Sequence, residues 1–515
     1  MVLSVLCLKH KKLFRPSRLS VHIAQCGILF SYPIRYTDPL LYHILFTHSA
    51  ITNIYSCLPG LNMILMNNNH SSHTENRLAT DKVGSLIARY SIPNTIAFVF
   101  FSIQAIVDGI IVGNYLGADA LASVSLILPA YMLPSGIANI LAVGAQAQMS
   151  IAMGEQNYVR VKTALITGST SILVFSLIIF SIFNLFPVRL AGIMGAEGDL
   201  FVGSLNYIHG LMPFVGVNLI MFFLNSILKT LGHPRFAMNV IILSILLNIV
   251  LSILFVTQFD LGTFGVGLAT GVSISVGCLL SLFVVFKSLR SHPTLKKIRG
   301  KFSWRSLGRM FYNGSSEGLT EIAMNVTVVL FNLTFLKYAG KEGVAAFAVT
   351  NYIIFIGTSI LLGISDGAIP VISFNHGANL WQRVRQSLKV VLRTNFIIGV
   401  VFLVFLWSLG EYAISIFLDN SSQDVIDMAI NGSRIMGFAF LLNGFNISSA
   451  SFFTALDKAK WSLIISSFRG LIFIVIGITV LPRILGTNGI WMTVGFAELF
   501  TAIISLALLR RTMRE

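Results

Sequence analysis

The chain has 515 residues, of which 55% are hydrophobic and only 11% are charged. Soluble domains carry about 25% charged residues, so this composition excludes an ordinary soluble enzyme and predicts an all-α membrane protein in contact with the lipid bilayer. The net charge of +16 is spread over short breaks between apolar runs. That distribution is typical of membrane topology, so we expect no nucleic-acid partner.

Nothing in the sequence indicates a metal site or a bound cofactor. Of the four cysteines, only Cys278 lies in the strongly apolar part of the chain, and no disulfide or zinc spacing is present. No glycine-rich phosphate loop appears either. We therefore expect no cofactor, no metal and no catalytic residue, and no ATP hydrolysis by this chain itself.

Residues 1–65 differ in composition from the rest. They hold three of the cysteines and a single acidic residue, Asp38, and their apolar patches are too short to span a membrane at about 20 residues per span. Three interpretations stay open. The segment is non-native translated sequence upstream of a start at Met63 or Met66, a disordered N-terminal extension, or an organelle transit peptide. The break in composition favours the first.

From Pro93 onward, long apolar runs alternate with short polar breaks. Twelve runs are long enough to cross a membrane as helices. They cover residues 93–113, 119–145, 163–184, 204–228, 236–257, 264–287, 314–336, 343–371, 388–408, 427–453, 459–481 and 489–509. The predicted units are an N-terminal six-helix lobe (66–290), a cytoplasmic basic linker (291–310) and a C-terminal six-helix lobe (311–515).

Lysine and arginine assign the sides of the membrane. Basic breaks follow every second span, and the longest connection, from Lys287 to Arg309, carries eight basic residues. Breaks between them are neutral, mixed or acidic, as at Glu411, Asp419 and Asp424. The excess of positive charge in short loops marks the cytoplasmic side. We therefore predict a multi-pass protein of the plasma (inner) membrane with both termini in the cytoplasm.

The two halves of the chain repeat. A shift of 223 residues aligns matching residues in each half, and a shift of 224 aligns a Leu-Gly-Thr motif. The aligned pairs are Tyr115 with Tyr338, Gly117 with Gly340, Ala122 with Ala345, Gly144 with Gly367, Gly154 with Gly377, Arg160 with Arg383, and Leu261-Gly262-Thr263 with Leu485-Gly486-Thr487. Six spans per half is an even number, so the repeats are parallel. This favours a transporter over a channel or a membrane-embedded enzyme.

Three motifs in order resemble those of the MATE family, the multidrug and toxic compound extrusion transporters of the MOP flippase superfamily. They are Val107-Asp108-Gly109-Ile110-Ile111-Val112-Gly113, Leu231-Gly232-His233-Pro234-Arg235-Phe236-Ala237-Met238 and Pro370-Val371-Ile372-Ser373-Phe374-Asn375-His376-Gly377-Ala378. The resemblance implies two six-helix lobes in a V shape. It also implies export of small amphipathic, often cationic compounds by antiport with H⁺ or Na⁺. We expect a monomer.

Asp108 is the strongest candidate for the ion-coupling residue. It lies deep in the first span, and an ionised side chain there costs at least about 2.5–3.5 kcal/mol, so a functional role is favoured over a structural one. The resemblance implies partners at Asn248, Ser252 and Thr270. Ser252 stands where the family often has Asp. With one carboxylate fewer, H⁺ is favoured over Na⁺ at Asp108, because a hard cation prefers more negative charge.

Further polar residues inside the spans are candidates for the substrate cavity. Gln104 precedes Asp108 by one turn, and Gln146 lies in the second span. Glu317 and Glu321 are four residues apart, so they share one face of the seventh span. Asp366 lies near Pro370, where it lines the cavity or satisfies broken backbone. Glu498, in the last span, has no predicted partner.

Two other functions stay open. A flippase or exporter of a lipid-linked or polyanionic precursor would need a more cationic cavity, and few Lys or Arg fall inside these spans. A membrane-embedded enzyme would need a His or acid cluster at one membrane face, and none stands out. The sequence therefore favours cation-coupled export of small molecules.

Overall fold

The computed structural model describes residues 77–415 and 422–514. Every regular element in these ranges is helical. The predictions for residues 1–65 and for Asp419 lie outside the described residues. The first three long helices are α5 (Val83–Leu116), α6 (Ala118–Gly154) and α7 (Tyr158–Leu185). The rest of the first half contains α8 (Pro187–Ile193), α9 (Asp199–Leu211), η2 (Met212–Phe214), α10 (Val215–Thr230), α11 (Pro234–Thr257) and α12 (Gly262–Ser291).

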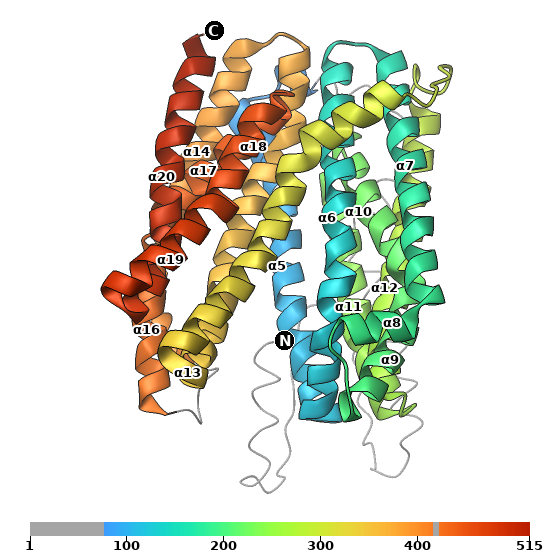
Figure 1. Ribbon diagram of the computed structural model, residues 1–515. Coiled ribbons are helices and arrows are strands. Elements are labelled where there is room, and N and C mark those ends of the chain that lie inside the picture. Colours follow the sequence, from blue (N-terminus) through green and yellow to red (C-terminus); the bar gives the residue numbers. More distant parts are fainter. Residues whose placement is uncertain (1–76, 416–421, 515) are drawn as a thin grey trace, which may run out of the picture. The chain divides into compact units, whose positions relative to one another are not determined.

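The second half begins with the 74-residue α13 (Trp304–Gly377). It continues with α14 (Trp381–Ser408), α15 (Gly410–Ser415), α16 (Gln423–Gly437) and α17 (Phe440–Ala455). It ends with α18 (Ala459–Ser467), the π-helix η3 (Phe468–Ile472), α19 (Phe473–Leu485) and α20 (Thr487–Arg514). The helices can be followed in Figure 1, and the connection from α12 to α13 lies at the same end as the C-terminal end of α20.

The described residues contain twelve spans. Ten helices are long and apolar enough to cross a membrane, and α16 with α17, bent by 51°, form an eleventh span. At 1.5 Å per residue, α13 would be about 111 Å long, far more than a bilayer core of about 30 Å. Its backbone leaves the helical region at Gly340, which divides it into two spans. The prediction of twelve transmembrane helices is therefore confirmed.

Several helices extend beyond the predicted spans. α5 begins at Val83 instead of residue 93, and α14 begins at Trp381 instead of residue 388. The additional turns carry polar and charged residues such as Arg89 and Arg383. Hydropathy detects only the segment inside the hydrocarbon, whereas backbone hydrogen bonding continues the helix into the polar zone.

The parallel repeat appears in the backbone. Gly117 and Gly340, which the 223-residue shift pairs, both have positive φ, at 89° and 63°. Gly262 and Gly486 also both have positive φ, at 54° and 59°. A side chain would be strained at these positions, so glycine permits the same tight turn between spans in each half. The repeat is therefore a structural one and not a coincidence of composition.

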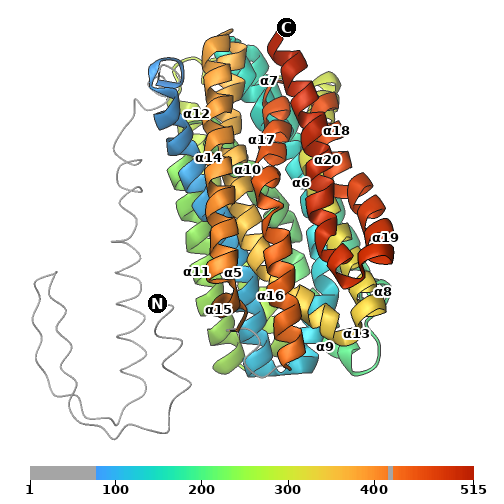
Figure 2. The ribbon, with the colours of Figure 1, turned by 90° about the vertical axis from the view of Figure 1, so that its left-hand side faces the viewer.

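The halves meet through reciprocal close contacts. A Cβ on Gly154 would collide with the carbonyl oxygen of Phe374, and a Cβ on Gly377 would collide with that of Ile151. Both partners and both glycines are 223 residues apart. Such reciprocity is what a two-fold relation between the halves produces. Figure 2 shows α14 beside α5 and α17 beside α20, in agreement with their contacts.

Candidate functional site

The predicted ion-coupling residues come together between α5, α11 and α12. The side-chain amide of Asn248 lies 3.0 Å from Asp108 Oδ1 on one side and 3.0 Å from Thr270 Oγ1 on the other. An ionised carboxylate only accepts hydrogen bonds, so the Asn248 nitrogen donates to Asp108 and its oxygen accepts from Thr270. The Gln104 amide lies 3.1 Å from the Asn248 atom that faces Asp108.

Local sequence explains how these helices carry the site. α11 begins with Pro234 at its first turn, where a missing backbone N–H has no cost, and Asn248 is among the buried residues of this helix. Asn248 is fully buried, and Ser252 follows one turn later with 1% of its surface exposed. Thr270 Oγ1 also lies 3.1 Å from the Val266 carbonyl, which competes with Asn248 for its single hydroxyl proton.

Ser252 is buried without a hydrogen-bond partner for its hydroxyl. An unpaired buried hydroxyl costs about 1–3 kcal/mol, so it marks a place where an ion, a water or a proton-carrying group would be stabilised. The groups around the Asp108 carboxylate are the amides of Asn248 and Gln104, with the Thr270 hydroxyl on the far side of Asn248. This set suits a proton on the carboxyl group and offers a monovalent cation only one full negative charge.

The environment of Asp108 includes two more ionisable side chains. Tyr131 of α6 and Tyr207 of α9 lie within electrostatic reach of its carboxylate. Within residues 77–415 and 422–514, no cationic side chain is among the groups that act on this carboxylate. An acid inside a membrane with no nearby positive charge is costly to ionise. This makes Asp108 suited to binding and releasing a proton.

The predicted cavity residues of the second half separate into two places. Glu317 and Asp366 of α13 lie within electrostatic reach of each other, and Ser451 of α17 donates to Asp366 Oδ1 at 3.4 Å. Glu321, one turn from Glu317, accepts a hydrogen bond from the Asn139 side chain of α6 instead. Glu317 and Glu321 share a helix face but have different partners.

Gln146 joins neither group. It lies on α6 with 1% of its surface exposed, and its Oε1 has no partner. Two residues later on the same helix, Gln148 and Ser306 exchange two hydrogen bonds, of 3.0 and 2.9 Å. Gln146 is two residues from Gln148 and so lies on the other side of α6 from this contact with the second half.

Sequence reasoning missed two buried cations. Lys229, at the end of α10, directly follows the predicted span 204–228 but has only 8% of its surface exposed. Its ammonium donates to Asn94 Oδ1 at 3.3 Å, and Asp366 and Glu317 lie within electrostatic reach of it. The apolar stem of lysine can cover hydrocarbon surface, so its position near the end of a span did not indicate burial.

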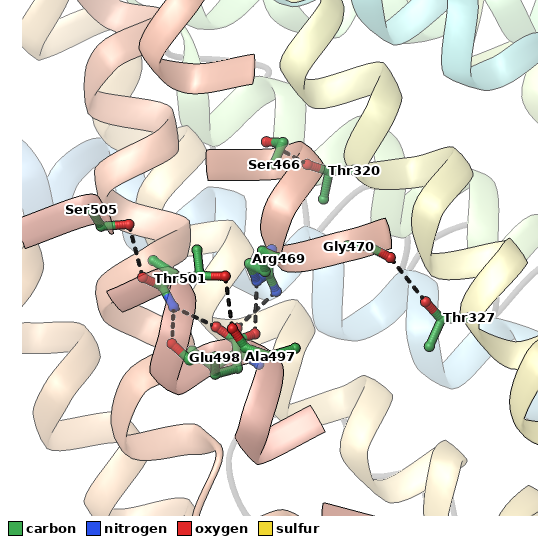
Figure 3. Close-up of polar contacts among 11 residues, drawn as sticks. Thr320, Thr327, Ser466, Arg469, Gly470, Ala497, Glu498, Thr501 and Ser505 are labelled. Carbon is green, nitrogen blue, oxygen red and sulfur yellow. Dashed lines mark hydrogen bonds and ion pairs between the residues drawn. The ribbon is translucent and has the colours of Figure 1, made fainter. Parts of the chain in front are cut away.

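The second cation, Arg469, pairs with Glu498. Arg469 Nε donates to Glu498 Oε1 at 2.8 Å, with 13% and 4% of the two side chains exposed (Figure 3). Asn446 Nδ2 donates to Glu498 Oε2 at 2.7 Å. Glu498, for which the sequence predicted no partner, therefore belongs to a buried ion pair inside the C-terminal half. A lone arginine in the apolar run 459–481 was the signal that could have revealed it.

The π-helix η3 presents Arg469 to this network. A π-helix inserts one extra residue into a helical turn and often occurs at functional sites. Figure 3 shows η3 between α20 and the first span of α13. Thr327 donates to the Gly470 carbonyl at 3.3 Å, which satisfies one backbone oxygen of the bulge. The bulge thereby connects the ion pair to α13.

No cluster of three or more His, Cys, Asp or Glu side chains with metal-binding geometry occurs in the ranges that the structure describes.

Comparison with known proteins matches both halves. The MatE family model matches residues 93–254 and again residues 318–479. The chain is 24% identical to the multidrug export protein MepA of Staphylococcus aureus (strain MSSA476) over 421 residues, which is 81% of this chain and 91% of MepA. MepA of Staphylococcus saprophyticus is also 24% identical, over 422 residues, with the same coverage of both chains.

Solved structures show the same fold. An outward-facing multidrug resistance MATE family transporter of the MOP superfamily superposes with a TM-score of 0.78, at 22% identity, over 85% of this chain and 97% of that one. A MATE transporter in its straight conformation superposes with a TM-score of 0.78, at 21% identity, over 85% of this chain and 98% of that one.

Proposed function

Because the chain belongs to the MatE family of multi-pass membrane transporters, we propose that it exports small amphipathic, cationic compounds in exchange for protons, with Na⁺ as the alternative coupling ion. In this proposal the protein works as a monomer in the plasma membrane, with both termini in the cytoplasm, and is not an enzyme. The multidrug export assigned to MepA supports the substrate class.

The observation that carries the proposal is the hydrogen-bonded chain from Asp108 through Asn248 to Thr270, which joins three helices. A proton on Asp108 changes the carboxyl group from an acceptor to a donor, so Asn248 must change its hydrogen bonds. Two protonation states then stabilise two packings of α5, α11 and α12. A proton shifts that equilibrium only through its different affinity for the two packings, which is the requirement for coupled transport.

The buried cations argue against the flippase alternative. A cavity for a pyrophosphate-linked lipid would need unpaired positive charge, but Arg469 is paired with Glu498 and Lys229 faces Asp366 and Glu317. Both cations are therefore balanced by carboxylates within the protein. The charge of this interior suits a cationic substrate better than a polyanionic one.

The test is transport by the full chain in liposomes with ethidium as the probe. We expect a pH gradient, acidic on the side that corresponds to the cell exterior, to drive ethidium toward that side. A Na⁺ gradient at equal pH on both sides should not. Ethidium movement driven by Na⁺ alone would assign the coupling ion to Na⁺, and no movement under either gradient would contradict ion-coupled export of cations.

A further inference from the structure

Lys229 and two carboxylates lie where the halves of the protein meet. Lys229 belongs to α10 in the first half, whereas Glu317 and Asp366 belong to α13 in the second. Lys229 and Glu317 have 8% and 7% of their surfaces exposed. The two acids are the carboxylates that attract the Lys229 ammonium. A buried cation from one half therefore faces two acids from the other, and neither the repeat nor the Asp108 site requires this arrangement.

Asn94 fixes the position of this cluster in the contact between the halves. Its Oδ1 accepts from Lys229 at 3.3 Å, and its Nδ2 donates to the Gly363 carbonyl at 2.9 Å. Asp366 follows Gly363 by three residues and so lies on the same face of α13. A Cβ on Gly363 or on Gly367 would collide with the backbone of α5. Lys229 therefore lies beside a segment where the backbones of α5 and α13 are in close contact.

The charges of the cluster do not balance. Lys229 supplies one positive charge, and Glu317 and Asp366 supply two negative charges when both are ionised. Arg469, which also lies within electrostatic reach of Glu317, is already paired with Glu498. An unbalanced charge is costly inside a membrane protein. The cluster is therefore short of one positive charge, which a proton or another cation would supply.

One carboxylate oxygen is free to receive that charge. Glu317 Oε1 is buried and has no hydrogen-bond partner. Ser451 lies within hydrogen-bond reach of both acids, at Asp366 Oδ1 (3.4 Å) and, on Glu317, at an atom other than Oε1. A buried carboxylate oxygen without a partner needs either a proton of its own or a cation beside it. Glu317 thus marks the position in the cluster where an added cation would be bound.

We propose that Glu317 and Asp366 form a binding site for the cationic group of the substrate when the halves separate at this end, and that Lys229 replaces that group when they pack together. This inference rests on the proposed function, since it assigns a site to the cationic substrate. Lys229 acts as an internal competitor. Its return to the two acids displaces the substrate cation and favours release on the opposite side of the membrane.

The first test measures how far the halves are closed at this end, and it needs no substrate. Ser91 on α5 packs against Gly367 and donates to the Ile364 carbonyl at 2.8 Å. In a chain whose own cysteines are replaced by serine, Ser91→Cys should react slowly with a maleimide. Lys229→Gln should raise that rate by about tenfold, because it leaves two buried acids without their cation. Lys341→Gln, an exposed lysine of α13, is the matched control and should leave the rate unchanged.

Two further results decide the same point. Lys229→Arg keeps the charge and should restore slow labelling, which separates the effect from misfolding. The increase in Lys229→Gln should be larger at about pH 8 than at about pH 6, because protonated acids no longer require a counter-charge. Labelling of Lys229→Gln at the wild-type rate at both pH values would overturn the proposal.

The second test measures equilibrium binding of ethidium to the purified full chain. Without its internal competitor, Lys229→Gln should bind ethidium about tenfold more tightly than the wild type. The double variant Glu317→Gln, Asp366→Asn should bind about tenfold more weakly or more. Weaker binding by Lys229→Gln would contradict the competition. Absence of ethidium binding in the wild type would instead contradict the proposed function, and the labelling result would still decide the role of Lys229 in closing the halves.

Discussion

Asn248 and Asp108 face each other from α11 and α5, with 3.0 Å between the Asn248 amide and Asp108 Oδ1. The other end of the same amide contacts Thr270 of α12. A change at the carboxyl group therefore reaches two neighbouring helices through one side chain. In the proposed mechanism, this is the connection by which binding of a proton alters the packing of the N-terminal half.

Replacing the neutral partners should weaken coupling without abolishing it. Asn248→Ala and Thr270→Ala each remove an interhelical hydrogen bond, worth about 0.6–1.7 kcal/mol in a membrane protein. We expect pH-driven ethidium transport to fall by less than about twentyfold in each. Asn325→Ala, at an exposed amide of α13, is the control and should transport normally. Complete loss in Asn248→Ala with normal expression would show that Asn248 does more than support Asp108.

A second carboxylate should change the preference for the coupling ion. Ser252 is buried, its hydroxyl has no partner, and it lies one turn from Asn248. Ser252→Asp adds negative charge near Asp108, and a hard cation binds better as oxygen ligands and charge increase. Ethidium transport driven by a Na⁺ gradient should therefore appear or increase in this variant. Ser252→Asn introduces a side chain of the same size as Asp but without charge, and it should not gain Na⁺-driven transport. Equal Na⁺-driven transport in the two variants would argue against a role for the added charge.

The arrangement of the spans was largely predictable from the sequence, because hydropathy and paired glycines report local properties. Gly117 and Gly340 were aligned from the repeat alone, and both adopt positive φ. Asp108 was a candidate because it is an acid deep in an apolar run, and its partners Asn248 and Thr270 followed from the family resemblance. Their meeting depends on how three helices pack, which no single apolar run specifies.

The charged network of the second half was not predictable in the same way. Arg469 and Glu498 belong to separate spans, and a π-helix sets the angle of the arginine side chain. Lys229 lies beside a predicted loop, and its acidic neighbours belong to α13 of the other half. Burial of a long cationic side chain is a property of tertiary packing, which composition does not reveal.

Breaking the Arg469–Glu498 pair should destabilise the protein. Either Arg469→Met or Glu498→Leu leaves an uncompensated buried charge, which costs about 3–5 kcal/mol. The double variant removes both charges and should be closer in stability to the wild type. Thermal unfolding in detergent measures this. Arg77→Ala removes one partner of the exposed Arg77–Asp81 pair and should change stability by no more than about 1 kcal/mol. If the double variant unfolds at the same temperature as the single variants, the unpaired buried charge is not the cause of their instability.

Topology is testable with reporters that fluoresce only in the cytoplasm. Basic residues surround Arg299 between α12 and α13, and Arg514 is the last residue of α20. We expect bright fusions after each of these residues, because positive charge in short loops stays on the cytoplasmic side. A fusion after Asp424, in the first turn of α16, should be dark. Fluorescence from the Asp424 fusion would contradict the predicted membrane topology, and the proposed direction of export depends on that topology.

Asp108→Asn tests the central claim most directly. The substitution keeps the size of the side chain and removes its ability to titrate. Proton release on addition of ethidium to purified protein should fall relative to the wild type, and pH-driven transport in liposomes should be abolished while the protein stays folded. If Asp108→Asn transports ethidium at the wild-type rate under the same pH gradient, Asp108 does not carry the coupling proton.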